Sequence, residues 1–306
     1  MEFKKVALFG AGAVGSFFYW NIRKDPEVEL YLIAEGERKE RLEREGLWIN
    51  GEQYFPLVKT PEEGRGADLL IVATKQAALE ENLETIKTLV GEKTLVISPL
   101  NGVTSEELIA SVVGEEPVIY SVIRVSSARK GNQIHFPPEK EKTRFSIGEK
   151  GKTIASERVI ALQEFLDRHN IQTQIKEDIL QDEWAKYASN IAQNLPQALF
   201  QVGYGAYSDS QHIAFIAKKL WREVVAVAAA KGITLQPELT LFGHLSETTR
   251  FSTLQDIDAG RHTEIDMFAG EMVKMGAELA IPVPYNEFIY HAIKAVEEKN
   301  DGKFNY

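Results

Sequence analysis

The sequence predicts an α/β N-terminal domain with a doubly wound parallel sheet, followed by an all-α C-terminal domain. Short β-type runs alternate with helical stretches up to about residue 176, and a glycine-rich motif joins the first strand to the first helix. Only helical patterns follow from about residue 178. Alternating strands and helices are typical of a parallel sheet covered by helices. We therefore predict a Rossmann-like domain over 1–177 and a helical domain over 178–306.

Apolar runs mark the central strands of the first domain. Several are apolar at successive positions, as strands buried on both faces are. The later run "EKEKTR" is interpreted as a solvated loop, followed by an antiparallel edge strand that ends near residue 149. A helix over 156–170 and a strand over 171–176 complete the domain. The central strands cover 5–10, 28–34, 68–74, 94–100 and 117–125, and helical stretches between them cover 15–24 and 76–90.

The second domain shows helical patterns only. The first helix is expected to end before Pro196, and Gly232 is expected just after the C-terminus of the second. We expect the active site between the domains, facing the C-terminal ends of the strands. The long apolar helices serve either the domain core or a homodimer interface, and the sequence leaves both open. The predicted helices cover 179–195, 209–231, 237–249, 261–280 and 285–298.

Composition argues against several function classes. The formal net charge of −10 argues against a nucleic-acid partner or an anionic membrane surface. The chain has no cysteine, which excludes disulfides and thiol catalysis, and its histidines lack metal-ligand spacing, so we expect no metal site. The N-terminus does not resemble a signal peptide, and no apolar run is long enough to span a membrane. We therefore expect a cytoplasmic protein.

The motif "GAGAVG" has the spacing of a dinucleotide-binding loop between a strand and a helix. The first glycine permits the tight turn, the second lets the backbone approach a pyrophosphate, and the third lets the helix pack against the sheet. Unpaired N–H groups at the helix N-terminus then favour the phosphates. The alternative is a tight turn that binds nothing. The predicted cofactor-binding residues here are Gly10, Ala11, Gly12, Ala13, Val14 and Gly15.

Glu35 follows the second predicted strand, 20 residues beyond the last glycine of the motif. An acidic side chain there can accept hydrogen bonds from the ribose hydroxyls of NAD and repels the 2′-phosphate of NADP. The alternative is a solvated glutamate. Because Arg38, Lys39 and Arg41 follow closely, a 2′-phosphate still has cations within reach, so the sequence leans to NAD and leaves NADP open.

Polar residues follow three further strands, where a nicotinamide is expected. Lys75 follows one strand and Asn101 the next; their alternatives are a solvated lysine and a simple Asn-Gly turn. Ser127, just after the fifth strand, is a weaker candidate.

The helical half contains two polar clusters. In "WAKYASNIAQN", Lys186, Asn190 and Asn194 recur every four residues along one helix face that drifts by about 40° per step. The alternative is a face wetted by solvent. In the second cluster, Ser252 could cap a helix or bind a ligand carboxylate. Glu264 and Asp266 lie at an acidic helix start, where the helix dipole alone could account for them, Asp266 above all. We interpret His262 as structural.

These motifs resemble the ketopantoate reductase (2-dehydropantoate 2-reductase) family along nearly the whole chain. The glycine motif is generic, whereas the W-x-K-x-x-x-N helix and the closely spaced pair "STLQDI" and "GRHTEID" are specific. The matching segments are "GAGAVG" at 10–15, "ATK" at 73–75, "NGV" at 101–103, "ARKGNQIHF" at 128–136, "EWAKYASNIAQN" at 183–194, "STLQDI" at 252–257 and "GRHTEID" at 260–266.

The resemblance implies reduction of 2-dehydropantoate to (R)-pantoate with NADPH, for pantothenate and coenzyme A synthesis. It implies that Lys186 is the general acid and that Glu264 meets the ribose and the reacting hydroxyl. Asn190, Asn194 and Ser252 are then substrate-binding residues. Asn101 contacts cofactor and substrate, and Lys75 and Ser127 contact the cofactor.

Two departures from the family pattern favour an alternative. Glu35 stands where many members have an arginine for the 2′-phosphate, and Tyr204 replaces a substrate-side asparagine. Both favour an NAD-dependent D-2-hydroxyacid dehydrogenase acting on more apolar, branched or aromatic 2-keto acids. A non-catalytic nucleotide sensor is a third class, and the intact set of Lys186, Glu264 and Asn101 argues against it.

Overall fold

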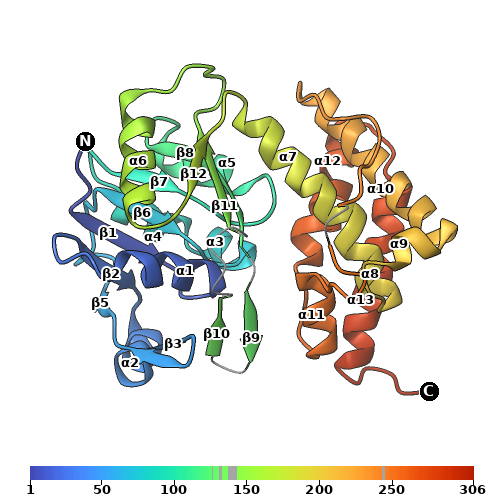
Figure 1. Cartoon of the computed structure of the whole chain (residues 1–306), viewed down its shortest axis with the longest axis horizontal. Helices are drawn as coiled ribbons and strands as arrows, with labels where there is room; N and C mark the ends of the chain where they lie inside the picture. The colour runs from blue at the N-terminus through green and yellow to red at the C-terminus, as the bar shows by residue number, and fades with distance from the viewer. Residues whose placement is uncertain (126, 131–132, 137–142, 243–244) are drawn as a thin grey trace. The chain divides into compact units, whose positions relative to one another are not determined.

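The computed structural model describes residues 1–125, 127–130, 133–136, 143–242 and 245–306 (Figure 1). The chain forms two compact units, which we call unit 1 (Met1–Asp182) and unit 2 (Glu183–Tyr306). Unit 1 contains a parallel-rich sheet with helices, and unit 2 is helical. This confirms the predicted fold class.

An eight-stranded sheet forms the centre of unit 1, in the order β12-β11-β8-β7-β6-β1-β2-β5. All neighbouring strands are parallel except β11 and β8, which are antiparallel. The predicted central strands are therefore confirmed. The strands are β1 (Lys5–Phe9), β2 (Glu29–Ile33), β5 (Leu57–Lys59), β6 (Leu69–Val72), β7 (Leu95–Ile97), β8 (Val118–Arg124), β11 (Arg144–Gly148) and β12 (Thr173–Ile175).

The predicted edge strand is not at the edge. It corresponds to β11, which pairs with β8 on one side and with β12 on the other. A second sheet in the order β4-β3-β10-β9 was not predicted, because its three-residue strands are not part of a longer apolar or alternating run. Most of the "EKEKTR" loop lies outside the described residues. The strands of the second sheet are β3 (Leu47–Ile49), β4 (Glu52–Tyr54), β9 (Ala128–Lys130) and β10 (Gln133–His135).

Helices of unit 1 pack against both faces of the large sheet. Alternate strand residues enter separate cores, with Leu8 and Ile71 in one and Ala7 and Leu70 in the other. The helix predicted over 76–90 is broken at Asn82, whose side chain donates a hydrogen bond to the carbonyl of Ala78 at 2.7 Å. The helices are α1 (Ala13–Ile22), α2 (Gly36–Glu45), α3 (Gln76–Glu81), α4 (Leu83–Leu89), α5 (Ser105–Val113) and α6 (Glu157–Arg168).

The described residues of unit 2 form α-helices and two π-helices, which we label η2 and η3. Gly232 follows α10 with a φ of +80°, as its predicted place after a helix C-terminus requires. In the part of the chain that the structure describes, no helix is long and apolar enough to cross a membrane. The helices are α7 (Ile179–Ser189, which starts in unit 1), η2 (Asn190–Asn194), α8 (Leu195–Phe200), α9 (Ala206–Asp209), α10 (Gln211–Ala230), α11 (Ser252–Asp258), η3 (Asp266–Gly270), α12 (Glu271–Glu278) and α13 (Pro284–Asn300).

Two helix predictions in unit 2 are wrong. The first helix does not end before Pro196 but continues through η2 into α8. Proline is tolerated there because it lies in the first turn of α8, where its missing N–H is not needed.

The second error is the helix predicted over 237–249, whose described residues form none. The backbone of this segment bonds to other parts of unit 2 instead. The N–H of Phe242 donates to the Tyr204 hydroxyl at 2.6 Å, and the carbonyls of Glu247 and Thr249 accept from the N–H groups of Gly205 and Tyr204 at 2.9 and 3.1 Å. These tertiary bonds replace the helical ones.

Candidate active site

The cofactor candidates of unit 1 follow neighbouring strands of one parallel sheet. The glycine motif follows β1, Glu35 follows β2, and Lys75, Asn101 and Ser127 follow β6, β7 and β8. Since these strands are parallel, all five segments leave the same edge of the sheet. After β1 the chain continues to β2 on one side of β1, whereas β6 pairs with β1 on the other side. The strand order therefore reverses between β1 and β6, and open α/β sheets usually bind ligands at such a topological switch point.

The three glycines of the motif differ in the space around them. Gly10 has a φ of +120°, and a Cβ atom there would lie 2.4 Å from the carbonyl oxygen of Ala73. A Cβ at Gly15 would lie 2.0 Å from the carbonyl oxygen of Gly10. A Cβ at Gly12 would meet nothing within 4 Å, and Gly12 caps α1 with no side-chain hydrogen bond to the helix. The loop thus packs tightly at two glycines and leaves an open, positively polarised helix end at the third.

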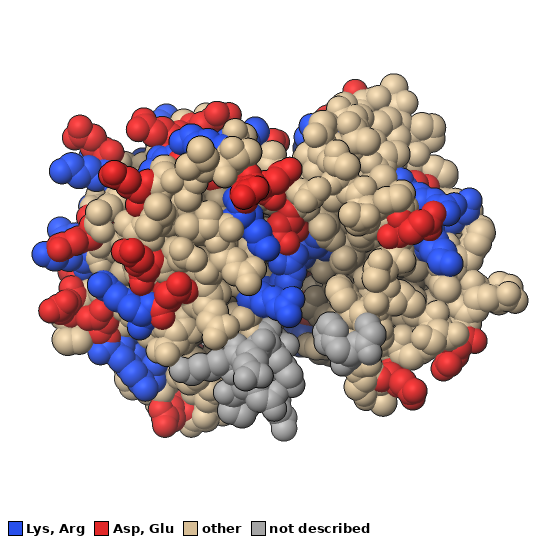
Figure 2. All heavy atoms as spheres, turned by 45° about the horizontal axis from the view of Figure 1, so that its top comes forward, with Lys and Arg blue, Asp and Glu red and all other residues tan. Residues whose placement is uncertain are grey.

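Glu35 is exposed at the N-cap position of α2. Among the nearby cations, Lys39 pairs with Glu63 at 3.3 Å. Burial and the positive charge of Arg41 lower the pKa of Arg38. On the face of unit 1 in Figure 2, acidic and basic side chains are interspersed. Glu35 is thus the first charged residue after β2, and Arg38 and Lys39 lie further along α2.

Lys75 and Asn101 both lie at turns between a strand and a helix. Lys75 is exposed at the N-cap position of α3, and Asn101 is half-buried next to Gly102, whose φ is +99°. The side chain of Gln76 donates to the hydroxyl of Thr104 at 3.2 Å, which ties the two turns together. Ser127 is half-buried just after β8.

The row of Lys186, Asn190 and Asn194 lies on one continuous helical path. Lys186 is on α7, and Asn190 and Asn194 are the first and last residues of η2. Four residues overshoot an α turn but fall short of a π turn, whose hydrogen bonds run from residue i to i+5. The π turn therefore counteracts the drift and keeps the row on one face. Asn194 is only 6% exposed, which argues against a solvent-wetted face.

A buried tyrosine hydroxyl stabilises this π turn. The hydroxyl of Tyr207 donates to the carbonyl of Gln193. In an α-helix this carbonyl would accept from the N–H of Gln197. Burial raises the pKa of Tyr207 far above its usual value, so the hydroxyl remains a donor. An unpaired carbonyl here would cost roughly 1–3 kcal/mol.

Glu264 lies just before the second π-helix, η3, and its half-buried position is fixed from both sides. The N–H and hydroxyl of Thr263 both donate to the buried carboxylate of Glu297, at 2.6 and 2.7 Å. The carbonyl of Glu264 accepts from the N–H of Phe268 at 3.1 Å. Within unit 2, η2 contacts both η3 and α11, so the helix of Ser252 and the π-helix after Glu264 both pack on the Asn190–Asn194 segment.

The structure excludes the capping alternative for Ser252 and gives the contacts of Asp266 and His262. Ser252 does not cap α11: it is the first helical residue and is exposed, whereas Phe251 occupies the N-cap position. Asp266 contacts Tyr290 and Lys294 at 2.9 and 3.1 Å, and His262 contacts Asp301 at 2.9 Å on the surface.

Tyr204 does not offer a free hydroxyl. Its hydroxyl donates to the Gln193 side chain at 2.9 Å and accepts from the N–H of Phe242 at 2.6 Å. The ring is buried between Tyr207 and Phe251, with centroid distances of 5.5 and 5.6 Å. Both bonding partners of the Tyr204 hydroxyl, Gln193 and Phe242, therefore lie within unit 2.

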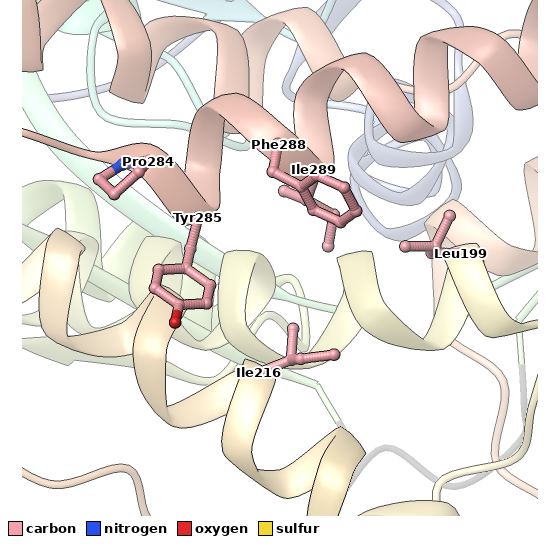
Figure 3. A pocket seen from close by; sticks show the side chains of 6 residues that line it. All are labelled: Leu199, Ile216, Pro284, Tyr285, Phe288 and Ile289. Carbon is pink, nitrogen blue, oxygen red and sulfur yellow. The ribbon is translucent and has the colours of Figure 1, made fainter.

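An apolar pocket of about 480 Å³ opens in unit 2, between α8, α10 and α13 (Figure 3). None of the predicted site residues lines it. Phe215 and Phe288 are 51% and 63% exposed, so α10 and α13 do not bury all of their apolar surface within unit 2. The lining residues are Leu199, Ile216, Pro284, Tyr285, Phe288 and Ile289.

Sequence reasoning missed the supporting residues Tyr187, Tyr207 and Glu297. Tyr187 and Glu297 lie in α7 and α13, and Tyr207 lies in the four-residue helix α9. A tyrosine in a helix is expected in the core and a glutamate on the surface, so neither indicates a supporting role. The predicted site residues themselves fall into two groups, one at the sheet edge of unit 1 and one on the helices of unit 2. The first group suits dinucleotide phosphates, and the second offers a cation, a carboxylate and amides.

Comparison with known proteins identifies the family. The model for "Ketopantoate reductase PanE/ApbA" matches residues 6–150, and that for its C-terminal part matches residues 178–297. A 2-dehydropantoate 2-reductase of Pyrococcus horikoshii is 28% identical over 97% of this chain and 99% of the relative. One of Aquifex aeolicus is 26% identical over 96% of this chain and 97% of the relative.

Two solved structures have a similar fold. A PanE/ApbA family ketopantoate reductase from Ralstonia eutropha JMP134 has a TM-score of 0.82 at 24% identity, over 97% of this chain and 99% of that one. A D-mandelate dehydrogenase with NADH and anilino(oxo)acetate has the same TM-score at 22% identity, with the same coverage. The chain therefore belongs to the ketopantoate reductase family and is an NAD(P)-dependent oxidoreductase.

Proposed function

We propose that this chain reduces the ketone of 2-dehydropantoate to (R)-pantoate, with a hydride from NAD(P)H and a proton from Lys186. The observation that carries the proposal is the row of Lys186, Asn190 and Asn194, which the π turn keeps on one face. The relatives named 2-dehydropantoate 2-reductase support the same substrate.

Reduction of a 2-keto acid requires a proton donor at the carbonyl oxygen and an anchor for the carboxylate. A lysine meets the first need, because its charge stabilises the developing alkoxide as it gives up the proton. Asn190 and Asn194 offer neutral donors and acceptors that hold the substrate without competing for that proton. In this proposal the exposed hydroxyl of Ser252 binds the substrate carboxylate, and Glu264 meets the reacting hydroxyl.

The nicotinamide cofactor supplies the hydride. We propose that the loop of Gly10–Gly15 holds the pyrophosphate, with Lys75, Asn101 and Ser127 as further contacts at the same sheet edge. Glu35 then accepts hydrogen bonds from the adenosine ribose and disfavours a 2′-phosphate, so NADH is used at least as well as NADPH.

A second candidate is an NAD-dependent D-2-hydroxyacid dehydrogenase acting on branched or aromatic 2-keto acids. The observation that favours it is Tyr204, whose ring is apolar and whose hydroxyl is already bonded to Gln193 and Phe242. A substrate with a polar tail would find no hydrogen-bond partner at Tyr204, whereas a substrate with an apolar tail needs none. The similar D-mandelate dehydrogenase structure contains NADH.

Steady-state kinetics with two substrate classes and two cofactors test the proposal. We expect the highest kcat/KM with 2-dehydropantoate, by at least tenfold over 2-ketoisovalerate and benzoylformate. A higher kcat/KM with either of these apolar acids favours the second candidate. A strong preference for NADPH would refute the role of Glu35 while leaving the substrate assignment intact.

A further inference from the structure

Tyr187 connects the helix of Lys186 to the π-helix that follows Glu264. Its hydroxyl donates to the carbonyl of Phe268 at 2.6 Å, and the carbonyl of Met267 lies at 3.4 Å. The side chain is only 1% exposed, and its ring packs against Trp184 and Phe268 with centroid distances of 5.8 and 6.2 Å. The hydroxyl is thus held in place by packing as well as by the hydrogen bond.

Phe268 completes the connection to Glu264. Its carbonyl accepts from Tyr187, and its N–H donates to the carbonyl of Glu264 at 3.1 Å. Two hydrogen bonds therefore separate Glu264 from the residue that directly follows Lys186. Burial, reinforced by the charge of Glu271, raises the pKa of Tyr187 well above its usual value, so the hydroxyl donates at every pH at which the protein is assayed.

The same arrangement occurs in the other π-helix. There the hydroxyl of Tyr207 donates to the carbonyl of Gln193 within η2. A π turn changes the hydrogen-bond register of a helix and is often found at functional sites. In both η2 and η3, a buried tyrosine hydroxyl donates a hydrogen bond to a carbonyl within the π turn. The tyrosines are therefore part of what maintains the register next to the polar residues.

We propose that Tyr187 is a positioning residue that fixes Lys186 relative to Glu264 by holding the carbonyl of Phe268 in η3. This inference rests on the proposed roles of Lys186 and Glu264 and adds how their spacing is maintained. Nothing in the reaction requires the hydroxyl to touch substrate or cofactor. The hydroxyl acts on the geometry of the site. Turnover depends strongly on that geometry, because displacing a proton donor by up to about 1 Å lowers the rate.

The variant Tyr187→Phe tests the proposal because it removes the hydroxyl and keeps the ring. We expect kcat for the 2-keto acid that the wild type reduces best to fall by about tenfold, since misplacement of a donor carries a penalty of this order or more. The KM for NAD(P)H should stay within about twofold, because the proposed cofactor residues other than Glu264 lie in unit 1. Replacing Tyr187 by 4-aminophenylalanine restores a donor and should recover most of the lost kcat.

A matched control is Tyr31→Phe in unit 1. The hydroxyl of Tyr31 is equally buried and donates to the carbonyl of Gly64 at 3.0 Å, so the variant loses the same kind of bond. It should lower the melting temperature without changing kcat. An unchanged kcat in Tyr187→Phe overturns the proposal, and so does a variant that is unfolded at the assay temperature, since the hydroxyl is then a structural requirement.

Lys186→Ala, measured in the same assay, distinguishes the catalytic role of Lys186 from the positioning role of Tyr187. If it retains turnover, the proposed catalytic role fails. If it is inactive while Tyr187→Phe keeps the wild-type kcat, only the positioning role fails.

Discussion

A Cβ atom added at Gly15 would lie 2.0 Å from the carbonyl oxygen of Gly10, whereas one added at Gly12 would meet nothing within 4 Å. Two glycines of the same motif therefore serve different purposes. Gly15 brings α1 close to the end of β1, and Gly12 leaves space at the start of α1. Packing and ligand binding can be separated by mutating them one at a time.

Gly12→Ala should leave the fold intact and weaken NAD(P)H binding by about tenfold, roughly 1.4 kcal/mol, because its methyl group occupies the space next to the pyrophosphate. Gly15→Ala should instead destabilise unit 1 by at least about 2 kcal/mol, since backbone atoms must move. Thermal unfolding and fluorescence titration with NAD(P)H measure the two effects. Equal losses of stability in both variants would contradict this division.

Glu35→Ala should raise the ratio of kcat/KM for NADPH to that for NADH by about tenfold, because it removes a carboxylate that repels the 2′-phosphate. Glu37→Ala is the matched control, since Glu37 lies in the first turn of the same helix. It should leave the ratio within about twofold. No change of the ratio in Glu35→Ala, or an equal change in Glu37→Ala, would argue that Glu35 is a solvated surface residue.

Glu149 should make the stability of unit 1 depend on pH. Burial alone would raise its pKa, but hydrogen bonds from Lys152 and Arg158 outweigh burial and lower the pKa to about 2. Since the usual value is 4.5, the stabilisation is complete above pH 4.5 and is lost as the pH falls towards 2. Between pH 7 and pH 3 the loss should be about 2 kcal/mol.

Urea unfolding of the wild type and of Glu149→Gln at pH 7 and pH 3 measures this loss. The variant should be less stable than the wild type at pH 7, and the difference should shrink at pH 3. A difference that stays constant with pH would mean that the charge of Glu149 is not what stabilises the fold.

Much of unit 1 could be predicted because its strands are apolar along their length and its glycine motif has a fixed spacing. The second sheet could not, since β3 and β10 are not part of a longer apolar run as the equally short β7 is. The position of β11 inside the sheet also depends on β12, which returns along it after α6. Pairing of this kind is decided by tertiary packing.

In unit 2 the polar row of Lys186, Asn190 and Asn194 was visible from its spacing, but the π turn was not. Its register depends on Tyr207, 14 residues beyond Gln193, and no local propensity encodes that bond. The segment around Phe242 has a helical pattern but bonds to Tyr204 instead. Long-range hydrogen bonds therefore decided both features.

The role of Lys186 as the proton donor is tested most simply by measuring turnover of Lys186→Ala with the preferred 2-keto acid. Lys274→Ala is the matched control, because Lys274 is an exposed lysine of unit 2 outside the proposed site. Circular dichroism and NAD(P)H titration should show that both variants fold and bind cofactor. We predict that Lys186→Ala loses at least about 10²-fold in kcat and Lys274→Ala none. A folded Lys186→Ala variant with near wild-type kcat would show that Lys186 is not the proton donor.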